Sequence, residues 1–212
     1  MNELKQNKEI TELLEILEEN GLQKEKAEVL ALVDYIGEME QTLSSMLTEM
    51  KEMRKEVNLI HDNTLRAKCE ALAQGADQKI RQGISMVVKA KENFVISAKN
   101  ALDTFKEKGK EALKKAVNAM KIPEALDKMG GFFEKMASSL REGVVNLQGA
   151  LEEYASAKQH RTNARSLLFG KKPSKAATVK NDRCILARMM QNLRADLVLL
   201  KLRHIILRIR FV

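Results

Sequence analysis

The residues best able to carry metal or nucleophilic chemistry in this 212-residue chain are its histidines and cysteines. They are His61, His160, His204, Cys69 and Cys184. A metal site on one helix face needs two ligands three or four residues apart, and no histidine has a His, Cys or carboxylate at that spacing. His61 and Cys69 are about 80° out of phase on a helix. The pattern therefore predicts solvent-facing histidines and no metal site.

The sequence also contains no motif for nucleophilic catalysis or for binding a cofactor. Neither cysteine has a histidine nearby in the chain, and no serine lies in a GxSxG turn. No glycine-rich phosphate loop is present, and carboxylate pairs such as Glu18-Glu19 and Glu152-Glu153 are typical of solvated helix surfaces. We therefore expect no catalytic residue, no cofactor and no small-molecule substrate, and predict that the protein is not an enzyme. Two widely separated cysteines indicate reduced thiols and a cytoplasmic location.

The composition is that of long helices. Aromatic residues make up 4% of the chain, charged residues 31%, Trp is absent, and proline occurs twice. Such a profile is typical of helical bundles and coiled coils. No apolar run approaches the roughly 18–20 residues of a membrane-spanning helix. The predicted fold class is all-α, with long amphipathic helices in a coiled coil or elongated helical bundle and a basic C-terminal tail.

A regular apolar seam is the strongest pattern in the sequence. Ten residues follow one another at alternating spacings of three and four, without a polar residue among them: Val29, Leu32, Ile36, Met39, Leu43, Met46, Met50, Met53, Val57 and Ile60. This heptad repeat predicts that the helix pairs along one face. The partner is left open between another helix of the same chain and another copy or protein. Four methionines indicate an adaptable surface.

Stop signals and periodicity predict four helices, at about 7–19, 23–62, 78–121 and 123–168. Asn20-Gly21 ends the first helix, and Pro123 suits the first turn of the last. Because Gly75 and Gly83 weaken a helix, we expect a bend or loop between 61 and 83. Residues 169–182 are predicted to be a linker and residues 183–212 a basic apolar tail. Folding back into antiparallel hairpins and an extended coiled coil both remain open.

Charge suggests an alternative function. Residues 1–60 contain seven basic and 14 acidic residues, net −7, whereas residues 171–212 contain 11 and two, net +9. Within 80–121, lysines flank the apolar arc of residues 105–117, which suits an interfacial membrane helix or a helix in a bundle. The alternative hypothesis is thus peripheral binding of anionic membrane or nucleic acid through residues 80–121 and 171–212.

The order of three segments carries a resemblance. They are ITELLEILEENGLQKEKAEVLALVDYIGEMEQTL, ENFVISAKNALDTFKEKGKEALKKAV and RSLLFGKKPS. Over roughly residues 3–175 the chain resembles uncharacterised all-helical proteins of conjugative and related mobile elements of gut Firmicutes. This resemblance implies a bacterial cytoplasmic accessory protein of unknown role, and it assigns no functional residue.

The tail departs from that resemblance near Met189, where Glu stays absent while Leu, Ile and Arg accumulate. Such a shift is what a reading-frame change near the end of a gene would produce, so the tail is either part of the fold or foreign to it. Translating the other two frames would test this hypothesis. The leading functional prediction is a non-enzymatic scaffold protein whose seam pairs with itself or with another helical protein.

Overall fold

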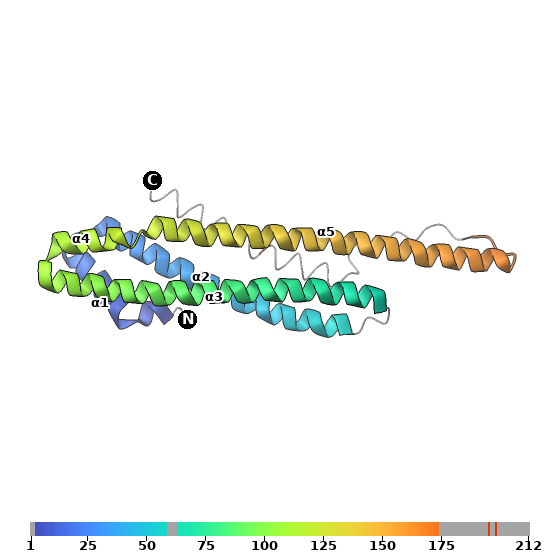
Figure 1. Cartoon of the computed structure of the whole chain (residues 1–212), viewed down its shortest axis with the longest axis horizontal. Helices are drawn as coiled ribbons and strands as arrows, with labels where there is room; N and C mark the ends of the chain where they lie inside the picture. Colours follow the sequence, from blue (N-terminus) through green and yellow to red (C-terminus); the bar gives the residue numbers. More distant parts are fainter. Residues whose placement is uncertain (1–2, 59–62, 174–194, 196–197, 199–212) are drawn as a thin grey trace. The chain divides into compact units, whose positions relative to one another are not determined.

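The computed structural model describes residues 3–58, 63–173, 195 and 198, and the ordered elements among them are all helical. The predicted all-α class is confirmed. The elements are the short 3-10 helix η1 (Glu3–Gln6) and the α-helices α1 (Lys8–Glu19), α2 (Gln23–Asn58), α3 (Asn63–Lys108), α4 (Lys110–Ala119) and α5 (Ile122–Leu168) (Figure 1). Ile60, most of the linker, and the tail other than residues 195 and 198 lie outside the described residues.

The chain divides into two compact units. Among the described residues up to 173, the first unit contains residues 3–45 and 79–136, and the second contains 46–58, 63–78 and 137–173. Helices α2, α3 and α5 each contribute to both units, whereas η1, α1 and α4 belong to the first alone.

Helix α1 begins and ends at the predicted signals. The Asn7 side chain caps its start by accepting a hydrogen bond from the Ile10 backbone N–H, 3.2 Å between the heavy atoms. At its end Gly21 has a φ of +68°, and the Leu22 N–H donates to the Leu17 carbonyl at 2.8 Å. This pairing is a Schellman motif, and both leucines are buried, which directs the chain into α2.

The third helix begins at Asn63 and not at about 78, and it runs through both Gly75 and Gly83. Of the range 61–83, in which a bend or loop was expected, residues 63–83 are therefore helical, and residues 61 and 62 lie outside the described residues. A helix tolerates isolated glycines when packing outweighs their cost of about 1 kcal/mol each. Small residues form much of the buried side of α3 in this region. They are Cys69, Ala73, Ala76 and Gly83, with the larger Ile80 and Val87 between and after them.

The predicted helix over 78–121 is two helices. The chain breaks at Gly109, whose φ of +75° and ψ of −165° are accessible to glycine and costly for other residues. The Gly109 N–H still donates to the Phe105 carbonyl at 2.8 Å, so α3 ends with a satisfied turn. A second positive φ, +50° at Lys121, separates α4 from α5.

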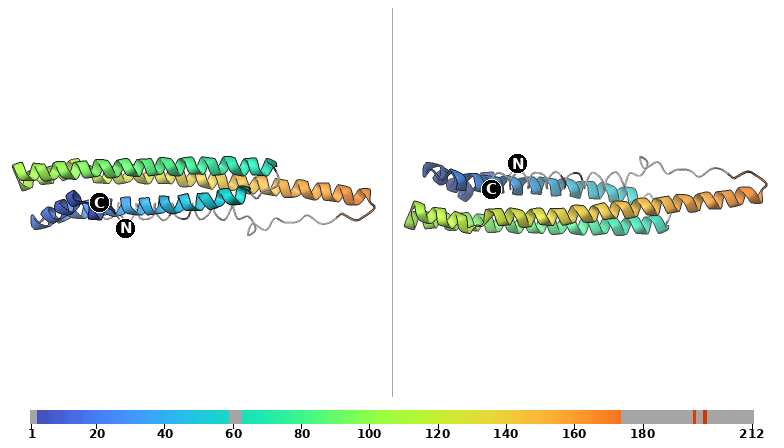
Figure 2. Two further views of the ribbon diagram at one scale, coloured as in Figure 1. Left: turned by 90° about the horizontal axis from the view of Figure 1, so that it is seen from below. Right: turned by 90° about the horizontal axis from the view of Figure 1, so that it is seen from above.

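Helices α2 and α3 fold back on each other as an antiparallel hairpin, which can be followed in both views of Figure 2. In the first unit Lys91 of α3 binds Glu40 of α2 at 3.0 Å. In the second unit Arg54 of α2 binds Asp77 of α3 at 3.2 Å. The residue numbers of the paired side chains increase along α2 while they decrease along α3, which means that the two helices are antiparallel. Of the two alternatives left open by the sequence, the hairpin is the one observed.

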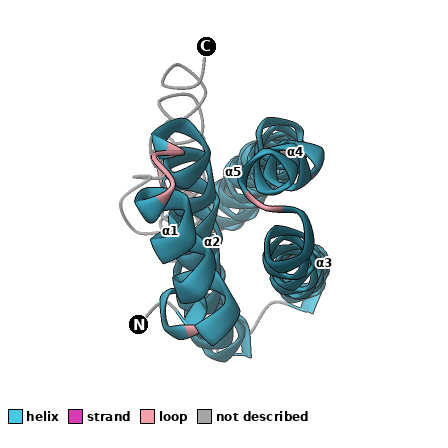
Figure 3. Cartoon of the chain, turned by 90° about the vertical axis from the view of Figure 1, so that its left-hand side faces the viewer, coloured by secondary structure: helices cyan, strands magenta, loops and turns pink. Residues whose placement is uncertain are grey.

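The N-terminal helices and α4 complete the first unit. Figure 3 shows α1 lying along α2, while α4 leads into α5 beside α3. Lys5 of η1 binds Asp34 of α2 at 2.7 Å, and Lys106 of α3 binds Glu12 of α1 at 3.1 Å. These ion pairs join η1 and α1 to the long hairpin.

Candidate helix-docking surface

The Met-rich seam of α2 is packed within the chain. Nine of its ten residues, Val29, Leu32, Ile36, Met39, Leu43, Met46, Met50, Met53 and Val57, are at most 4% exposed, and Ile60 lies outside the described residues. The alternative in which helices of the same chain cover the seam accounts for this burial. Pairing of the seam with a second protein stays a prediction, and these nine side chains offer it almost no accessible area.

Gly83 marks the point where three helices meet in the first unit. A Cβ atom added to Gly83 of α3 would lie 3.1 Å from Leu43 Cδ2 of α2 and 3.3 Å from Phe132 Cε1 of α5. The absence of a side chain at Gly83 therefore lets the backbone of α3 come close to Leu43 of α2 and Phe132 of α5. Bulky residues opposite small ones fill the space between helices without voids.

Lys91, the one cation inside the apolar arc of α3, is held by two carboxylates. Its ammonium binds Glu3 of η1 at 2.5 Å and Glu40 of α2 at 3.0 Å. The hydrogen bond with Glu3 is the main reason that the pKa of Lys91 is raised, and the same contact lowers the pKa of Glu3. These two ion pairs neutralise a half-buried charge and connect η1, α2 and α3.

The segment 105–117, considered for membrane insertion, presents its apolar face to the protein. Leu113 and Val117 of α4 are at most 1% exposed, and Ala101 and Leu102 just upstream are also buried. Lys106, one of the flanking lysines, pairs with Glu12. In this conformation the side chains that would enter a bilayer are already covered.

Residues considered for metal or thiol chemistry are not brought together in the described part of the chain. Cys69 is a buried cysteine in α3, and His160 is exposed on α5. His61, Cys184 and His204 lie outside the described residues. Among residues whose placement is given, no three His, Cys, Asp or Glu side chains form a cluster that could hold a metal ion. Nor is any described helix both long and apolar enough to cross a bilayer.

Helix α5 carries a second heptad seam. The first part of this seam is buried in the protein, and its C-terminal part is exposed. Its positions follow an unbroken three-four spacing: Leu126, Met129, Phe133, Met136, Leu140, Gly143, Leu147, Ala150, Tyr154, Ala157, Arg161, Ala164 and Leu168. Leu126, Met129, Phe133, Met136 and Gly143 are buried. From Tyr154 onward every seam position is exposed.

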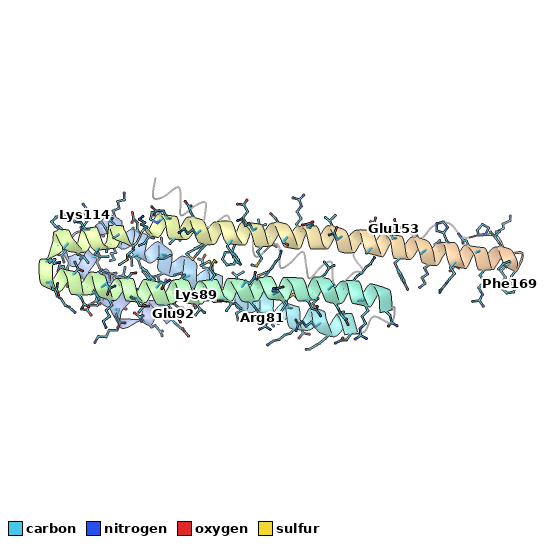
Figure 4. The ribbon with its side chains drawn as sticks, viewed as in Figure 1. Arg81, Lys89, Glu92, Lys114, Glu153 and Phe169 are labelled. Atoms are coloured by element: carbon cyan, nitrogen blue, oxygen red, sulfur yellow. The ribbon has the colours of Figure 1, made fainter. Side chains whose placement is uncertain are left out.

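The exposed end of α5 is a continuous stretch of helix without a buried side chain. All residues from Glu152 to Leu168 are described, and none is buried. Tyr154 is 39% exposed, Leu168 85%, and Phe169, which follows α5 at its C-terminal end (Figure 4), 70%. The helix persists because extending an existing helix costs far less than starting one, and its Glu, Ala, Lys and Arg residues favour the conformation.

Sequence reasoning missed this surface because its seam contains small and charged residues. After Leu140 the repeat continues through Gly143 and Ala150, which do not stand out as apolar positions. Small residues at regular seam spacing were the available signal, here as in α3.

The chain was compared with known proteins. Its sequence matches the model of a family of unknown function, DUF6674, over residues 6–201. No curated protein and no solved structure matches it. The match passes Met189, where the tail was expected to depart from the related proteins, and includes α1 to α5. Because it covers well over half of the 212 residues, the chain belongs to the family of unknown function DUF6674.

Proposed function

We propose that the protein is a non-enzymatic helical interaction protein that docks an amphipathic helix of another protein onto the end of α5. The docking surface consists of the five exposed seam positions Tyr154, Ala157, Arg161, Ala164 and Leu168. This proposal keeps the scaffold role predicted from the sequence and moves its surface from the covered seam of α2 to the uncovered seam of α5.

The observation that carries the proposal is the change in burial along one repeat. At Met129 and Phe133 the α5 seam is at most 4% exposed, whereas at Leu168 it is 85% exposed. A heptad repeat is useful only where another helix packs against it. A repeat that continues for two heptads without cover therefore supports a further helix as its partner.

Charge favours a partner with an acidic helix over a second copy. Arg161 stands at the centre of the exposed seam, and Lys158 and Arg165 lie along one edge. Two copies paired in register on this surface would bring Arg161 against Arg161, which is repulsive. A partner helix with apolar residues opposite Tyr154 and Leu168 and a carboxylate opposite Arg161 would instead form a charge-assisted contact within the seam.

A designed helical peptide can test this surface before any natural partner is known. The probe is a three-heptad amphipathic peptide with leucine at its seam positions and one Glu placed to face Arg161. The matched peptide has Lys at that position. We expect the wild-type protein to bind the Glu peptide at least about tenfold more tightly than the Lys peptide in fluorescence anisotropy, and Arg161→Glu to reverse the order.

Three further variants locate the binding. Tyr154→Ser and Leu168→Ser should weaken the Glu peptide, whereas Ile96→Ser, at a 58% exposed site on α3, should not. If neither peptide binds, or if Arg161→Glu leaves the preference unchanged, the proposal is wrong. Self-association seen by light scattering and abolished by Leu168→Ser would identify a second copy as the occupant and overturn the acidic partner.

The setting of this activity also remains a proposal. The resemblance to proteins of bacterial mobile elements supports a cytoplasmic accessory role, in which docking a helix of a second protein would be the whole activity. Fractionation of the source cells with an antibody to the protein would test the location, and recovery in the membrane pellet would contradict it.

A further inference from the structure

The exposed end of α5 has an edge on each side of its seam, and the two edges contribute different side chains. One edge is formed by the residues that precede Tyr154, Arg161 and Leu168, and the other by the residues that follow Ala157 and Ala164. The first edge consists of Glu153, His160 and Leu167, and the second of Lys158 and Arg165. All five edge residues are exposed. In paired helices the charges at such edges set the choice of partner and its orientation.

The charge of this surface changes along α5 from acidic to basic. Glu153 lies at its start, and Arg165 lies 12 residues further along the helix, a rise of about 18 Å. Lys171, just past the end of α5, is also exposed. No ion pair between described residues uses any of these three side chains. They are therefore available to a docked helix.

The apolar area of the surface widens toward the C-terminal end of α5. Leu167 is 60% exposed, and it joins Leu168 and Phe169 in a run of three exposed apolar residues. The first edge is therefore apolar at this end, whereas it is polar at Glu153 and His160. Figure 4 shows Glu153 and Phe169 toward opposite ends of the surface. A docked helix would meet an acidic edge at one end of the surface and apolar and basic side chains at the other.

The end of α5 fixes the length of the surface. Helix α5 stops in a Schellman motif, in which Gly170 has a φ of +67° and the Lys171 N–H donates to the Ser166 carbonyl at 2.8 Å. From Tyr154 to Leu168 the helix rises about 21 Å. A partner helix of about four turns therefore spans the surface, and its first and last turns meet opposite charges.

We infer that the helix docked on this surface runs antiparallel to α5, with acidic and apolar residues in its first turn and a basic residue in its last turn. This inference rests on the proposed function, because it specifies the direction of the helix that binds there. The antiparallel direction places the first turn of the partner against Arg165, Leu167 and Lys171, and its last turn against Glu153.

The helix dipole is the reason for choosing this direction. Carboxylates stabilise the first turn of a helix and cations stabilise its last turn. An antiparallel partner can therefore complement the charges of α5 with residues that also stabilise the partner helix itself. A parallel partner would need a cation in its first turn, opposite Glu153, and carboxylates in its last turn, opposite Arg165. Both would oppose its own dipole.

A nitroxide-labelled peptide tests the direction on the full chain. The peptide keeps the leucine seam and the Glu that faces Arg161, and adds Glu at the edges of its first heptad and Lys at the edges of its last heptad. With the nitroxide at the N-terminus of the peptide, we expect the backbone amide NMR signals of Leu167 and Leu168 to be broadened more strongly than those of Glu153 and Tyr154. With the nitroxide at the C-terminus, the order should reverse.

A matched peptide, in which only the edge charges are exchanged between the first and last heptads, controls for composition. It should bind at least about threefold more weakly in fluorescence anisotropy. The double variant Glu153→Lys/Arg165→Glu, at two exposed sites, should remove that preference. A preference that this variant leaves unchanged would come from the helicity of the peptides alone and would overturn the inference.

The direction and the docking surface can fail separately. If the N-terminal nitroxide broadens the signals of Glu153 and Tyr154 more strongly, or both ends equally, the antiparallel direction is wrong. Binding that still depends on Arg161 would then leave the proposed function in place. If none of the peptides binds, both the direction and the proposed function are wrong.

Discussion

At the scale of single residues, the structure explains charged groups that the sequence placed on apolar faces. Lys91 interrupts the arc of α3 because it pairs with Glu3 and Glu40 from two other elements. Glu28 is buried near the start of α2, and this burial disfavours the charged form of its carboxyl group. The pKa values of Lys91 and Glu28 are both raised, so each group makes the folded protein less stable as the pH rises through its titration range.

Lys91→Met should lower the free energy of unfolding by about 1 kcal/mol at pH 7, because the apolar stem remains while both ion pairs are lost. The raised pKa of Lys91 means that this stabilisation is present below the usual value of 10.5 and disappears as the pH rises through the raised pKa. Urea unfolding at pH 7 and pH 11 should therefore show a difference that shrinks at the higher pH. Lys89→Met, at an exposed site on the same helix (Figure 4), should change stability by less than about 0.5 kcal/mol at both pH values.

Glu28→Gln should stabilise the protein at pH 7, whereas Lys91→Met should destabilise it. Burial raises the pKa of Glu28, so the folded protein holds this proton more tightly than the unfolded chain does. Stability of the wild type therefore falls as the pH rises through 4.5 to the raised pKa, and the glutamine variant avoids that loss. We expect Glu28→Gln to raise Tm by a few degrees at pH 7 and to lose its advantage at pH 4. Glu15→Gln, at an exposed site in the middle of α1, is the control, and an equal pH-dependent gain there would contradict the explanation.

At the scale of elements, small residues decide how the long helices pack. In the first unit Leu43 of α2 and Phe132 of α5 both lie against Gly83 of α3. The same glycine that lowers the intrinsic helix propensity of α3 is therefore needed for its packing.

Gly83→Leu should destabilise the protein by about 1–3 kcal/mol, because the new side chain would overlap Leu43 and Phe132. Leucine is the better helix former, so a loss of stability isolates the packing effect. Gly75→Leu adds the same side chain to the same helix in open space, and should be neutral or stabilising. Equal effects of the two substitutions in thermal unfolding would show that close packing at Gly83 is unimportant.

At the scale of the whole molecule, charge is distributed unevenly along the chain, from net −7 in residues 1–60 to net +9 in residues 171–212. The same basic residues underlie the hypothesis of membrane or nucleic-acid binding.

The 212-residue chain should not be retained by anionic liposomes at 0.15 M salt, a concentration at which charges more than about 8 Å apart are screened. The physical reason is that Leu113 and Val117, which would have to enter the bilayer, are buried in the first unit. Co-sedimentation measures this directly. Retention that Leu113→Ser abolishes would mean that α4 leaves the bundle to bind lipid, and would support the membrane hypothesis instead. DNA co-sedimentation at two salt concentrations tests the hypothesis of nucleic-acid binding.

The sequence by itself determined the helical class, the caps of α1, the start of α5 and the period of the α2 seam, because each depends on local spacing and backbone preference. It could not determine what covers that seam. The buried side of α3 contains Cys69, Ala73, Ala76 and Gly83, and small side chains carry little hydrophobic signal even when they are essential for close packing.

Only the tertiary structure decided that α2 and α3 form a hairpin, that Gly109 divides the third predicted helix, and that the seam of α5 extends past its cover. These features depend on which distant residues lie side by side, and periodicity along one helix is the same whether its partner is present or absent. Tyr154 and Leu168 belong to the same repeat as Phe133, and the fold alone leaves the first two in water and the third in the core.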